Sequence, residues 1–532
     1  MAGTDIRALD EAYADYLRDE SRRVGVAESI SFPDSEAAVR TVLRQMAAAH
    51  KLVTVQGART GITGGAVPAG GHVLNLSRMR RITGLRRDAA RNRFFLTVQP
   101  GVLLSEVRAC LHEREFPTAD WTQASLDALA HLRQAEEQCF PPDPTEPSAS
   151  IGGMVACNAS GARSFFYGPT RNHVEALRVL LPDGDGLTVK RGRDRARGCH
   201  FRLRLDSGKV LSGEVPRYRA PAVKSAAGYH IAENMDLLDL FIGMEGTLGV
   251  VTELELALAP APVCTWGIMC FLPDRQSALQ LVRVLREEKR CASCPAQCRP
   301  VALEFFSRSA LDVLRSQKQT NPAFSLLPAL PTAPAEAVYV EYHGSCENEV
   351  VAGAESLESL LGEIGGNSNC TFAGSTTREL DRLQDIRHAV PEAVNLLIDE
   401  RRKDHPSLTK LGTDMSVPND RLDAVMNLYE SGLNNTGLQG ILFGHIGDNH
   451  VHVNILPRDT QDYEKGKALY LDWAREVVGM GGSVSAEHGI GKIKPDFLRL
   501  MLGDNVIAEM RKLRRTFDPE ERLNRGNLFG GC

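Results

Sequence analysis

Four of the fourteen histidines in this sequence lie between positions 445 and 488, within two short glycine-rich segments. In the first segment, alternation from His450 onward predicts a strand that carries His450, His452 and Asn454 on one face. His445 stands in the turn before that strand. In the second segment, Glu487 directly precedes a histidine in the stretch SAEHGIGK. We therefore expect imidazoles and a carboxylate to share one site.

Two or three imidazoles and one carboxylate suit a borderline divalent metal such as zinc, with water or a substrate atom completing the coordination sphere. A single buried histidine is more often only hydrogen-bonded in the core, so the interpretation depends on the clustering of four. Taken alone, His445, His452 and Glu487 are consistent with a metal-dependent hydrolase that activates water.

A glycine-rich loop, QGARTGITGGAVP at 56–68, follows a predicted buried strand over 52–55. Its glycines would let backbone N–H groups approach an anion such as a diphosphate. The spacing is not that of a Rossmann fingerprint, and no Gly-Lys-Ser/Thr of a P-loop is present. A hairpin is the alternative for this loop alone. Two similar loops, 150–161 and 243–251, favour a long cofactor lying along one domain.

The elements that must position these loops alternate between strand and helix, which indicates an α/β arrangement in this half. Asp34 and Ser35 predict a helix start, with apolar spacing over 38–46. A further strand is expected over 94–98 and a helix over 104–111. Residues 119–140 read as an inserted surface helix. Prolines 260 and 262 mark a domain boundary, and beyond it longer amphipathic segments are expected at 275–289, 349–361 and 421–433.

Composition limits the classes of partner. The chain has 532 residues, with 62 Lys and Arg against 67 Asp and Glu, so its net charge is only −5. This balance argues against a protein held on nucleic acid by bulk charge. No stretch approaches the roughly 18 apolar residues of a transmembrane segment, and the first residues do not form a secretory signal. Twelve scattered cysteines fit a reducing compartment, so we expect a cytoplasmic protein.

One cysteine group stands apart because its spacing, C-x2-C-x3-C, can ligate metal or an iron–sulfur cluster. It consists of Cys291, Cys294 and Cys298. Cluster ligation normally uses four cysteines, and a fourth is not nearby, so a free or oxidisable surface loop is the preferred interpretation.

The three glycine loops together resemble the FAD domain of the vanillyl-alcohol-oxidase-type (PCMH-type) flavoproteins. The shared motifs are GxxTGxxGG, then IGG with NAxG, then GxEGTLGVVT. In that family two α/β subdomains hold FAD in an extended pose. Some members attach FAD through a histidine in the first loop; that loop has none here, so the resemblance implies noncovalent FAD. It implies cofactor contacts at Gly57, Arg59, Thr60, Gly61, Gly64, Gly65, Pro144, Ser150, Gly152, Gly153, Asn158, Gly161, Glu245, Gly246, Gly249, Val250 and Asn524.

The histidine segments resemble the C-terminal domain of FAD-linked D-2-hydroxyacid dehydrogenases, whose motif GHxGDGNxHxN is followed by EHGxG. These enzymes include D-lactate and D-2-hydroxyglutarate dehydrogenases and the flavin subunit of glycolate oxidase. The resemblance implies a divalent metal, zinc by preference, at His445, His452 and Glu487. It also implies a general base at His488 and a substrate contact at Asn454.

Two features of this resemblance concern the substrate and the ligand set. Arg387 and Lys410 match the cations that hold the substrate carboxylate in the family. Pro391 stands where some relatives carry a hydroxyl, so a second substrate carboxylate would be bound differently or be absent. The family motif has Gly-Asn where this chain has Asn449-His450. His450 could therefore compete as a ligand or lie behind the ligands, and the sequence leaves both open.

The resemblance implies an α+β fold, in which a PCMH-type FAD-binding domain of two subdomains is joined to an α/β cap domain with an antiparallel sheet. We expect an N-terminal helical extension over 1–29, the FAD domain over 30–262, the cap over 263–480, and a C-terminal segment over 481–532 that returns to the flavin.

The implied reaction is oxidation of a D-2-hydroxy acid to the 2-oxo acid, with a hydride passing to flavin N5. The electrons would go to a quinone, an electron-transfer flavoprotein, a cytochrome or an iron–sulfur subunit rather than to NAD. Such a partner could hold the protein at the inner membrane, and a homodimer is an open possibility. The alternatives are the metal-dependent hydrolase and a non-catalytic FAD subunit of a larger redox complex.

Overall fold

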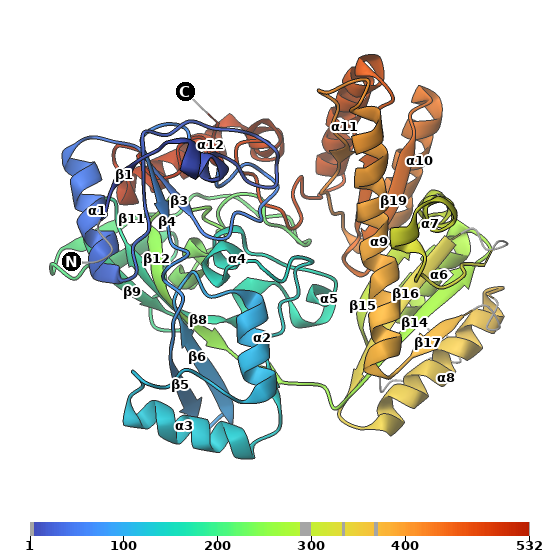
Figure 1. Ribbon diagram of the computed structural model, residues 1–532, viewed down its shortest axis with the longest axis horizontal. Helices are drawn as coiled ribbons and strands as arrows, with labels where there is room; N and C mark the ends of the chain where they lie inside the picture. The colour runs from blue at the N-terminus through green and yellow to red at the C-terminus, as the bar shows by residue number, and fades with distance from the viewer. Residues whose placement is uncertain (1–4, 288–298, 332–335, 367–370, 531–532) are drawn as a thin grey trace.

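The computed structural model describes residues 5–287, 299–331, 336–366 and 371–530, in which two groups of sheets and helices lie side by side (Figure 1). The chain passes from the first group to the second between β13 (Ala259–Pro260) and β14 (Cys264–Leu272). The cysteine group at 291–298 lies outside the described residues. The prediction of an α+β fold is confirmed.

The first group contains a five-stranded antiparallel sheet in the order β5-β6-β12-β8-β9 and a four-stranded sheet in the order β1-β2-β4-β3. In the smaller sheet β2, β4 and β3 run parallel. Two short ribbons, β10–β11 and β7–β13, complete this half. The strands are β1 (Arg7–Ala8), β2 (Ser29–Ser31), β3 (Val53–Gln56), β4 (His72–Asn75), β5 (Ile82–Asp88), β6 (Arg93–Val98), β7 (Gln138–Cys139), β8 (Val174–Leu180), β9 (Gly186–Lys190), β10 (His200–Arg204), β11 (Val210–Glu214) and β12 (Val250–Ala257).

The helices of this half form where apolar spacing and caps coincide. Helix α1 (Glu36–Ala48) begins at Ser35, whose hydroxyl accepts a hydrogen bond from the backbone N–H of Ala38, as the sequence predicted. Its apolar stripe faces the smaller sheet. The segment expected to be helical over 119–140 is helical only in its middle. The other helices are α2 (Leu104–Glu113), α3 (Gln123–Gln134), α4 (Ile151–Cys157) and α5 (Ser164–Tyr167).

The second group is built on a seven-stranded sheet in the order β17-β14-β16-β15-β19-β20-β18, in which all the pairs are antiparallel. Its further strands are β15 (Pro300–Phe306), β16 (Glu336–Gly344), β17 (Phe372–Gly374), β18 (Leu411–Gly412), β19 (Gly440–His445) and β20 (His450–Ile455). The predicted strand that begins at His450 is confirmed as β20.

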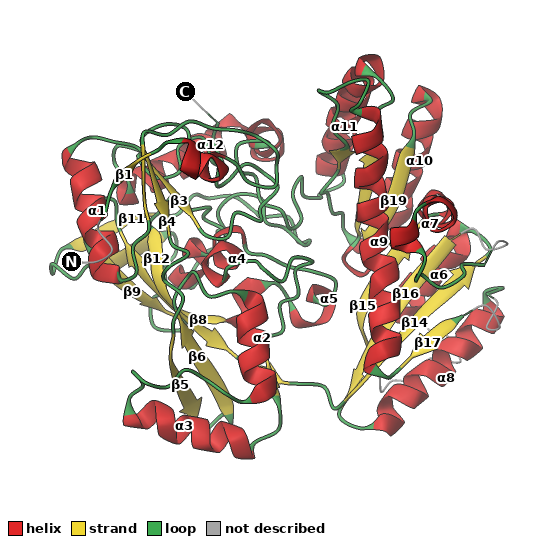
Figure 2. Cartoon of the chain, in the orientation of Figure 1, coloured by secondary structure: helices red, strands yellow, loops and turns green. Residues whose placement is uncertain are grey.

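Helices cover both faces of this sheet (Figure 2). Alternate residues of β14 explain the two layers, because Ile268 and Cys270 share one core with α6 and α8, while Met269 and Phe271 share another with α7 and α9. The helices are α6 (Arg275–Leu285), α7 (Arg308–Thr320), α8 (Glu347–Glu363), α9 (Thr377–Arg401), α10 (Leu422–Thr436), α11 (Thr460–Gly479) and α12 (Pro495–Phe517). The three amphipathic segments predicted beyond the boundary correspond to α6, α8 and α10.

The predicted N-terminal helical extension is largely wrong. Within residues 5–29 the structure has a single 3-10 helix, Glu11–Leu17, and that helix buries none of its residues. A helix without a buried face gains little from packing, and short isolated helices are marginal in water. Tyr13 and Tyr16 instead pack their rings against Phe32.

The C-terminal segment returns to the first group, where α12 lies beside the N-terminal elements (Figure 1). Leu523 pairs in parallel with Val53 of β3. The backbone N–H of Asn524 donates to Val53 O at 2.8 Å, and Asn524 Oδ1 accepts from the N–H of Val55 at 2.8 Å. Residues 522–524 therefore complete the edge from which the first glycine loop departs.

The described helices were also compared with the length and hydropathy that a bilayer requires. None of those in the described ranges is both long and apolar enough to span a membrane.

Candidate functional site

A groove of about 370 Å³ runs along the three glycine loops. Glycine allows the backbones around it to approach closely. A Cβ on Gly57 would stand 2.2 Å from Ser150 Oγ, and one on Gly152 would stand 2.5 Å from Pro100 Cβ. Gly61 is different, because among the described residues, its two chain neighbours apart, no heavy atom lies within 4 Å of the position its Cβ would take. The first loop is therefore packed at one end and open to the groove at its middle.

Ser150 joins the first loop to the second. Its hydroxyl caps α4 by accepting from the N–H of Gly153 and also accepts from the N–H of Ala58, at 3.4 and 3.2 Å. The residues predicted to contact a cofactor that line this groove are Gly57, Arg59, Thr60, Gly61, Gly65, Pro144, Ser150, Gly152, Gly153, Glu245, Gly246, Gly249 and Asn524.

Four predicted cofactor residues do not line the groove and have other contacts. Val250 is fully buried in the core beside α1. Gly161 packs so closely on Asp143 that a Cβ would stand 1.9 Å from its carbonyl oxygen. Asn158 caps α4 and accepts from the N–H of Arg171, while Gly64 turns with a positive φ beside Lys492. These residues shape the loops rather than the groove surface.

Glu245 lines the groove, yet its carboxylate points at the C-terminal segment. Oε1 accepts from the N–H of Ile490 at 2.6 Å and Oε2 from that of Gly491 at 2.7 Å. Asn527 adds a second tie, since its amide donates to the carbonyl oxygens of Gly65 and Glu245. The loop after His488 is thus held against the first half of the chain by one buried carboxylate.

This carboxylate makes stability depend on pH. Burial raises the pKa of Glu245 from 4.5 to about 7, despite the two N–H donors. The folded protein therefore keeps a proton that the unfolded chain releases near pH 4.5. The stabilisation is present below that pH and is lost as the pH rises toward 7. Since glutamine does not titrate, we expect the free energy of unfolding of wild type to fall relative to Glu245→Gln by roughly 3 kcal/mol between pH 4 and pH 8.

Urea-unfolding midpoints of both forms across this pH range would measure that difference. The free energies of unfolding of the two forms should also differ by a constant amount, because Glu245→Gln loses the oxygen that accepts from the N–H of Gly491. Parallel pH profiles of the two forms would contradict the assignment of the titration to Glu245.

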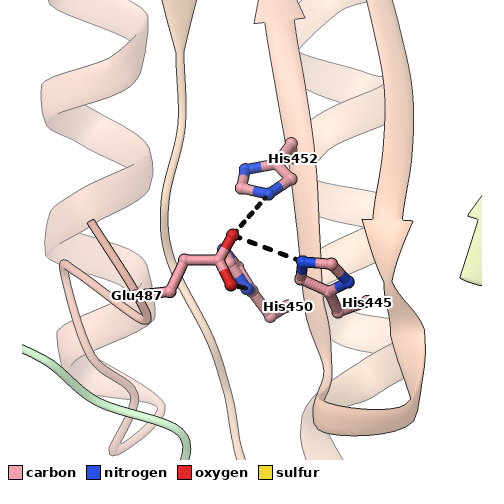
Figure 3. Close-up of side chains that lie close together, drawn as sticks. All are labelled: His445, His450, His452 and Glu487. Atoms are coloured by element: carbon pink, nitrogen blue, oxygen red, sulfur yellow. Dashed lines mark ion pairs between the residues drawn. The ribbon is translucent and has the colours of Figure 1, made fainter. Parts of the chain in front are cut away.

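The histidine cluster lies where β19 and β20 meet the C-terminal segment. Figure 3 shows His445, His450 and His452 around the carboxylate of Glu487. Glu487 Oε1 lies 3.3 Å from His445 Nε2 and 3.4 Å from His452 Nε2. One nitrogen from each of the three imidazoles and one carboxylate oxygen all lie within 4.8 Å of one another. The geometry suits a single metal ion held between the two segments.

The remaining nitrogens of two of these histidines are occupied by groups behind them. His445 Nδ1 lies 2.6 Å from Glu304 Oε1, and His452 Nδ1 lies 2.8 Å from Thr413 O. A carboxylate or carbonyl at one ring nitrogen fixes the tautomer and leaves the other nitrogen free to bind a metal. Both Nε2 atoms are thereby presented to Glu487.

Glu487 is held from the opposite side by the first half of the chain. Its Oε2 accepts from Lys224 Nζ at 2.9 Å and from Ser160 Oγ at 3.4 Å. Burial would favour the neutral acid, but Lys224 and His445 keep the pKa of Glu487 well below its usual range. The carboxylate is therefore ionised and leaves Oε1 for the cluster.

His488 completes the link between the two sites, because Glu487 and His488 also line the groove of the glycine loops. His488 Nδ1 lies 3.4 Å from Asp414 Oδ2. Its ring stacks on that of His452, with 5.4 Å between the ring centroids. Burial lowers the pKa of His488 to about 4, so its imidazole is neutral at neutral pH. A neutral imidazole at this junction can accept a proton from a molecule bound in the groove.

Asp414 is buried and joins the cluster to its surroundings. It receives the ammonium of Lys494 at 2.7 Å and the hydroxyl of Ser485 at 2.6 Å. It also accepts from the backbone N–H of His488 at 3.2 Å. One carboxylate thus holds the segment that carries Glu487 and His488.

Arg387, a residue of α9, lies close to the histidine cluster. Its Nη2 is 3.6 Å from Glu304 Oε2, the carboxylate that also holds His445, and its guanidinium lies over the ring of Tyr339. Its Nε is buried and has no hydrogen-bond partner among the described residues. A buried, unused N–H beside a metal-type cluster is suited to an anionic ligand.

The other two predicted substrate residues flank β20. Asn454 is buried on that strand and pairs with Gly412, while Lys410 directly precedes β18 and is half-buried. Burial lowers the pKa of Lys410, and Arg22 acts in the same direction.

Sequence reasoning missed several residues that hold this site. Glu304 had a detectable signal, because it is the only charged residue in the strand VALEFF, and a buried carboxylate must be paired. Lys224 and Asp414 gave no such signal. Asn527 gave no such signal either, although its amide donates to the carbonyl oxygens of both Gly65 and Glu245.

Comparison with known families divides the chain into two parts. The family described as FAD binding domain matches residues 27–126 and 123–190. The family described as FAD linked oxidases, C-terminal domain, matches residues 267–528. The first match contains the first two glycine loops, and the second contains the histidine cluster and Asn524. The third loop lies between the matched ranges.

Individual proteins resemble the chain over nearly its whole length. It is 27% identical to a D-lactate dehydrogenase of Anaerostipes hadrus, over 98% of this chain and 93% of that protein. It is 28% identical to a D-2-hydroxyglutarate dehydrogenase of Xanthomonas citri pv. viticola, over 97% and 92%. A solved structure of alkyldihydroxyacetonephosphate synthase has a TM-score of 0.59 at 14% identity, covering 94% of this chain and 76% of that one, which concerns the fold alone.

Proposed function

We propose that this chain, which belongs to the FAD-linked oxidases, oxidises a D-2-hydroxy acid of the D-lactate, D-2-hydroxyglutarate or glycolate class to the 2-oxo acid. The observation that carries the proposal is that Glu487 and His488 line the same groove as the glycine loops. A metal-type cluster and a cofactor groove that share two residues suit a reaction in which the substrate meets both. A hydrolase would leave the groove without a role.

The groove fits FAD without a covalent link. Gly61 leaves open space where a side chain would stand, and the first loop contains no histidine. Bound FAD supplies flavin N5 as acceptor of the hydride that leaves the substrate Cα. The chain's own residues supply the orientation of that substrate.

The cluster fits a divalent metal, zinc being the first candidate, with His445, His452 and Glu487 as ligands. A metal at this point would polarise the substrate hydroxyl and lower its pKa. His488, which stands beside Glu487 at the groove, takes the hydroxyl proton at Nε2, the ring nitrogen that does not face Asp414 and lies 3.5 Å from Glu487 Oε1.

The substrate carboxylate is held by cations. Arg387 offers a guanidinium whose buried Nε is unused, while Asn454 of β20 pairs with Gly412 of β18, and Lys410 directly precedes β18. The electrons taken from the substrate would then pass to a non-NAD acceptor: a quinone, an electron-transfer flavoprotein, a cytochrome or an iron–sulfur subunit.

Absorption spectra of the purified protein under anaerobic conditions test the proposal. We expect flavin bands that bleach when a D-2-hydroxy acid is added and persist with its L-enantiomer, because Arg387 and His488 fix the carboxylate and the hydroxyl in space. The control is the same titration with a D-amino acid of equal length.

Three other outcomes would each point elsewhere. Flavin bands that no acid of the panel bleaches would overturn the substrate class while leaving FAD binding. A colourless protein would bring the metal-dependent hydrolase forward. Bleaching by both enantiomers would contradict the proposed fixation of the substrate.

A further inference from the structure

We propose that His450 is a fourth protein ligand in the histidine cluster, so that the site consists of three imidazoles and one carboxylate. This inference rests on the proposed metal centre and extends it. The resemblance supplies only His445, His452 and Glu487, and it has Asn where this chain has His450. The chain's own departure therefore lies inside its metal-type cluster.

The burial of His450 supports the assignment. Its side chain is 0% exposed, and its Nδ1 has no hydrogen-bond partner among the described residues. Burying a ring nitrogen without a partner costs free energy comparable to a lost hydrogen bond, so such atoms are rare unless a ligand satisfies them. A metal ion beside Glu487 would satisfy this one.

The orientation of the ring agrees with ligation through one nitrogen. His450 Nε2 lies 3.0 Å from Asp414 Oδ1, while Nδ1 lies 3.9 Å from Glu487 Oε2. The carboxylate of Asp414 is placed to orient the proton on Nε2, which leaves a lone pair on Nδ1 facing the cluster. This arrangement repeats that of His445 in front of Glu304.

Each of the three imidazoles thus has a backing oxygen at one nitrogen and the cluster at the other. The backing oxygens are Glu304 Oε1, Asp414 Oδ1 and Thr413 O. The rings of His450 and His452 lie 4.3 Å apart, and those of His445 and His450 lie 5.4 Å apart. The three free ring nitrogens face the carboxylate of Glu487, those of His445 and His452 toward Oε1 and that of His450 toward Oε2, as in a ligand set.

A fourth protein ligand changes which ion suits the site. Catalytic zinc sites keep three protein ligands and an open position, whereas four ligands fill a tetrahedron. A site with His450 bound has room for substrate only on an ion that takes five or six ligands, such as Mn²⁺, Fe²⁺ or Co²⁺. With His450 bound, the site would therefore favour an ion that takes a fifth ligand readily over four-coordinate zinc.

Co²⁺ binding to the flavin-loaded protein after dialysis against a chelator tests this assignment. We expect His450→Asn, which restores the residue common in the family, to weaken Co²⁺ binding by more than about 100-fold, beyond the ~10- to 100-fold that loss of an outer-shell partner costs. The absorption of bound Co²⁺, measured at wavelengths longer than those of the flavin bands, should be weak in wild type because the ion has more than four ligands.

Asn449→Gly is the matched control, because it restores the other residue of the family motif. Asn449 has a φ of 52°, which glycine adopts readily, and its amide donates to Asn419 rather than to the cluster. We expect this variant to bind Co²⁺ like wild type.

Several results would overturn the inference. Co²⁺ binding by His450→Asn as tight as that of wild type would remove His450 from the ligand set, and so would a loss of less than about 100-fold. X-ray absorption of Co²⁺ in wild type counts imidazole ligands even if the variant does not fold, and two instead of three would decide against His450. Wild type that binds no Co²⁺ would reject the metal centre itself, while the bleaching of the flavin by a D-acid would still stand.

Discussion

Replacing His488 by alanine is expected to lower the rate of flavin reduction by a D-2-hydroxy acid by about 10²- to 10⁴-fold, the usual contribution of a positioned general base. His488 lies at the junction between the groove and the cluster, and its imidazole is stacked on His452 and faces Asp414. Without this group the hydroxyl proton has no acceptor at that point of the groove. Stopped-flow reduction of the flavin measures the loss directly.

The variant should remain folded and yellow, because no glycine loop depends on the His488 side chain. FAD content and metal content per chain check this. His131→Ala, at an exposed position of α3, is the control for the handling of the protein. A reduction rate within tenfold of wild type would exclude His488 as the base.

Replacing Arg387 by methionine is expected to raise KM and to lower kcat/KM by about 10²- to 10³-fold, since truncating one partner of a buried charge pair costs ~2–5 kcal/mol. The largely covered guanidinium lies between Glu304 and the ring of Tyr339, and its buried Nε is unused. Methionine keeps much of the volume and removes the charge. The kcat/KM of Arg387→Lys should lie between those of wild type and Arg387→Met, because lysine keeps the charge but lacks the planar guanidinium.

Steady-state kinetics with the acid that bleaches the flavin would measure this change. Arg382→Met, at an exposed position of the same helix, is the matched control and should behave like wild type. An unchanged KM in Arg387→Met would show that the substrate carboxylate is held elsewhere. A loss of FAD or an altered urea midpoint in Arg387→Met alone would instead indicate a structural role.

The residues that do chemistry could be found from the sequence because they occur in local patterns. The glycine loops at 56–68 and 243–251 and the pair Glu487–His488 are each readable within a dozen positions. The strand alternation at His450 and the helix cap at Ser35 are local in the same sense, and the structure confirms both elements.

The residues that orient this chemistry could not be found in the same way. Asp414 and Lys224 reach the cluster from other elements, and their neighbours in the sequence say nothing about Glu487. Which residues contact each other over such long sequence separations depends on how the two groups of sheets and the C-terminal segment pack together. Glu304 lies between these cases, because its charge in an apolar strand shows that it is paired but not with which residue.

The predicted helical extension near the N-terminus was wrong for the same reason, namely that it depends on packing between distant parts of the chain. A pattern of charges over 1–23 is compatible with helix, but whether a helix persists depends on a surface to pack against. The structure offers Phe32 and the first glycine loop instead, and Arg59 of that loop lies over the ring of Tyr16.

The pairing of Asn524 with the strand that precedes the first glycine loop also affects when the protein can acquire its flavin. Val55 and Asn524 are 469 positions apart, so on a ribosome that adds ~5–20 residues per second the second partner follows the first by roughly 20 to 90 s. During that interval the edge of β3 stays open and the groove is unfinished. We infer that FAD is loaded only after synthesis has nearly ended. Nascent chains arrested before position 518 should therefore lack bound flavin, and flavin on such chains would refute this order of events.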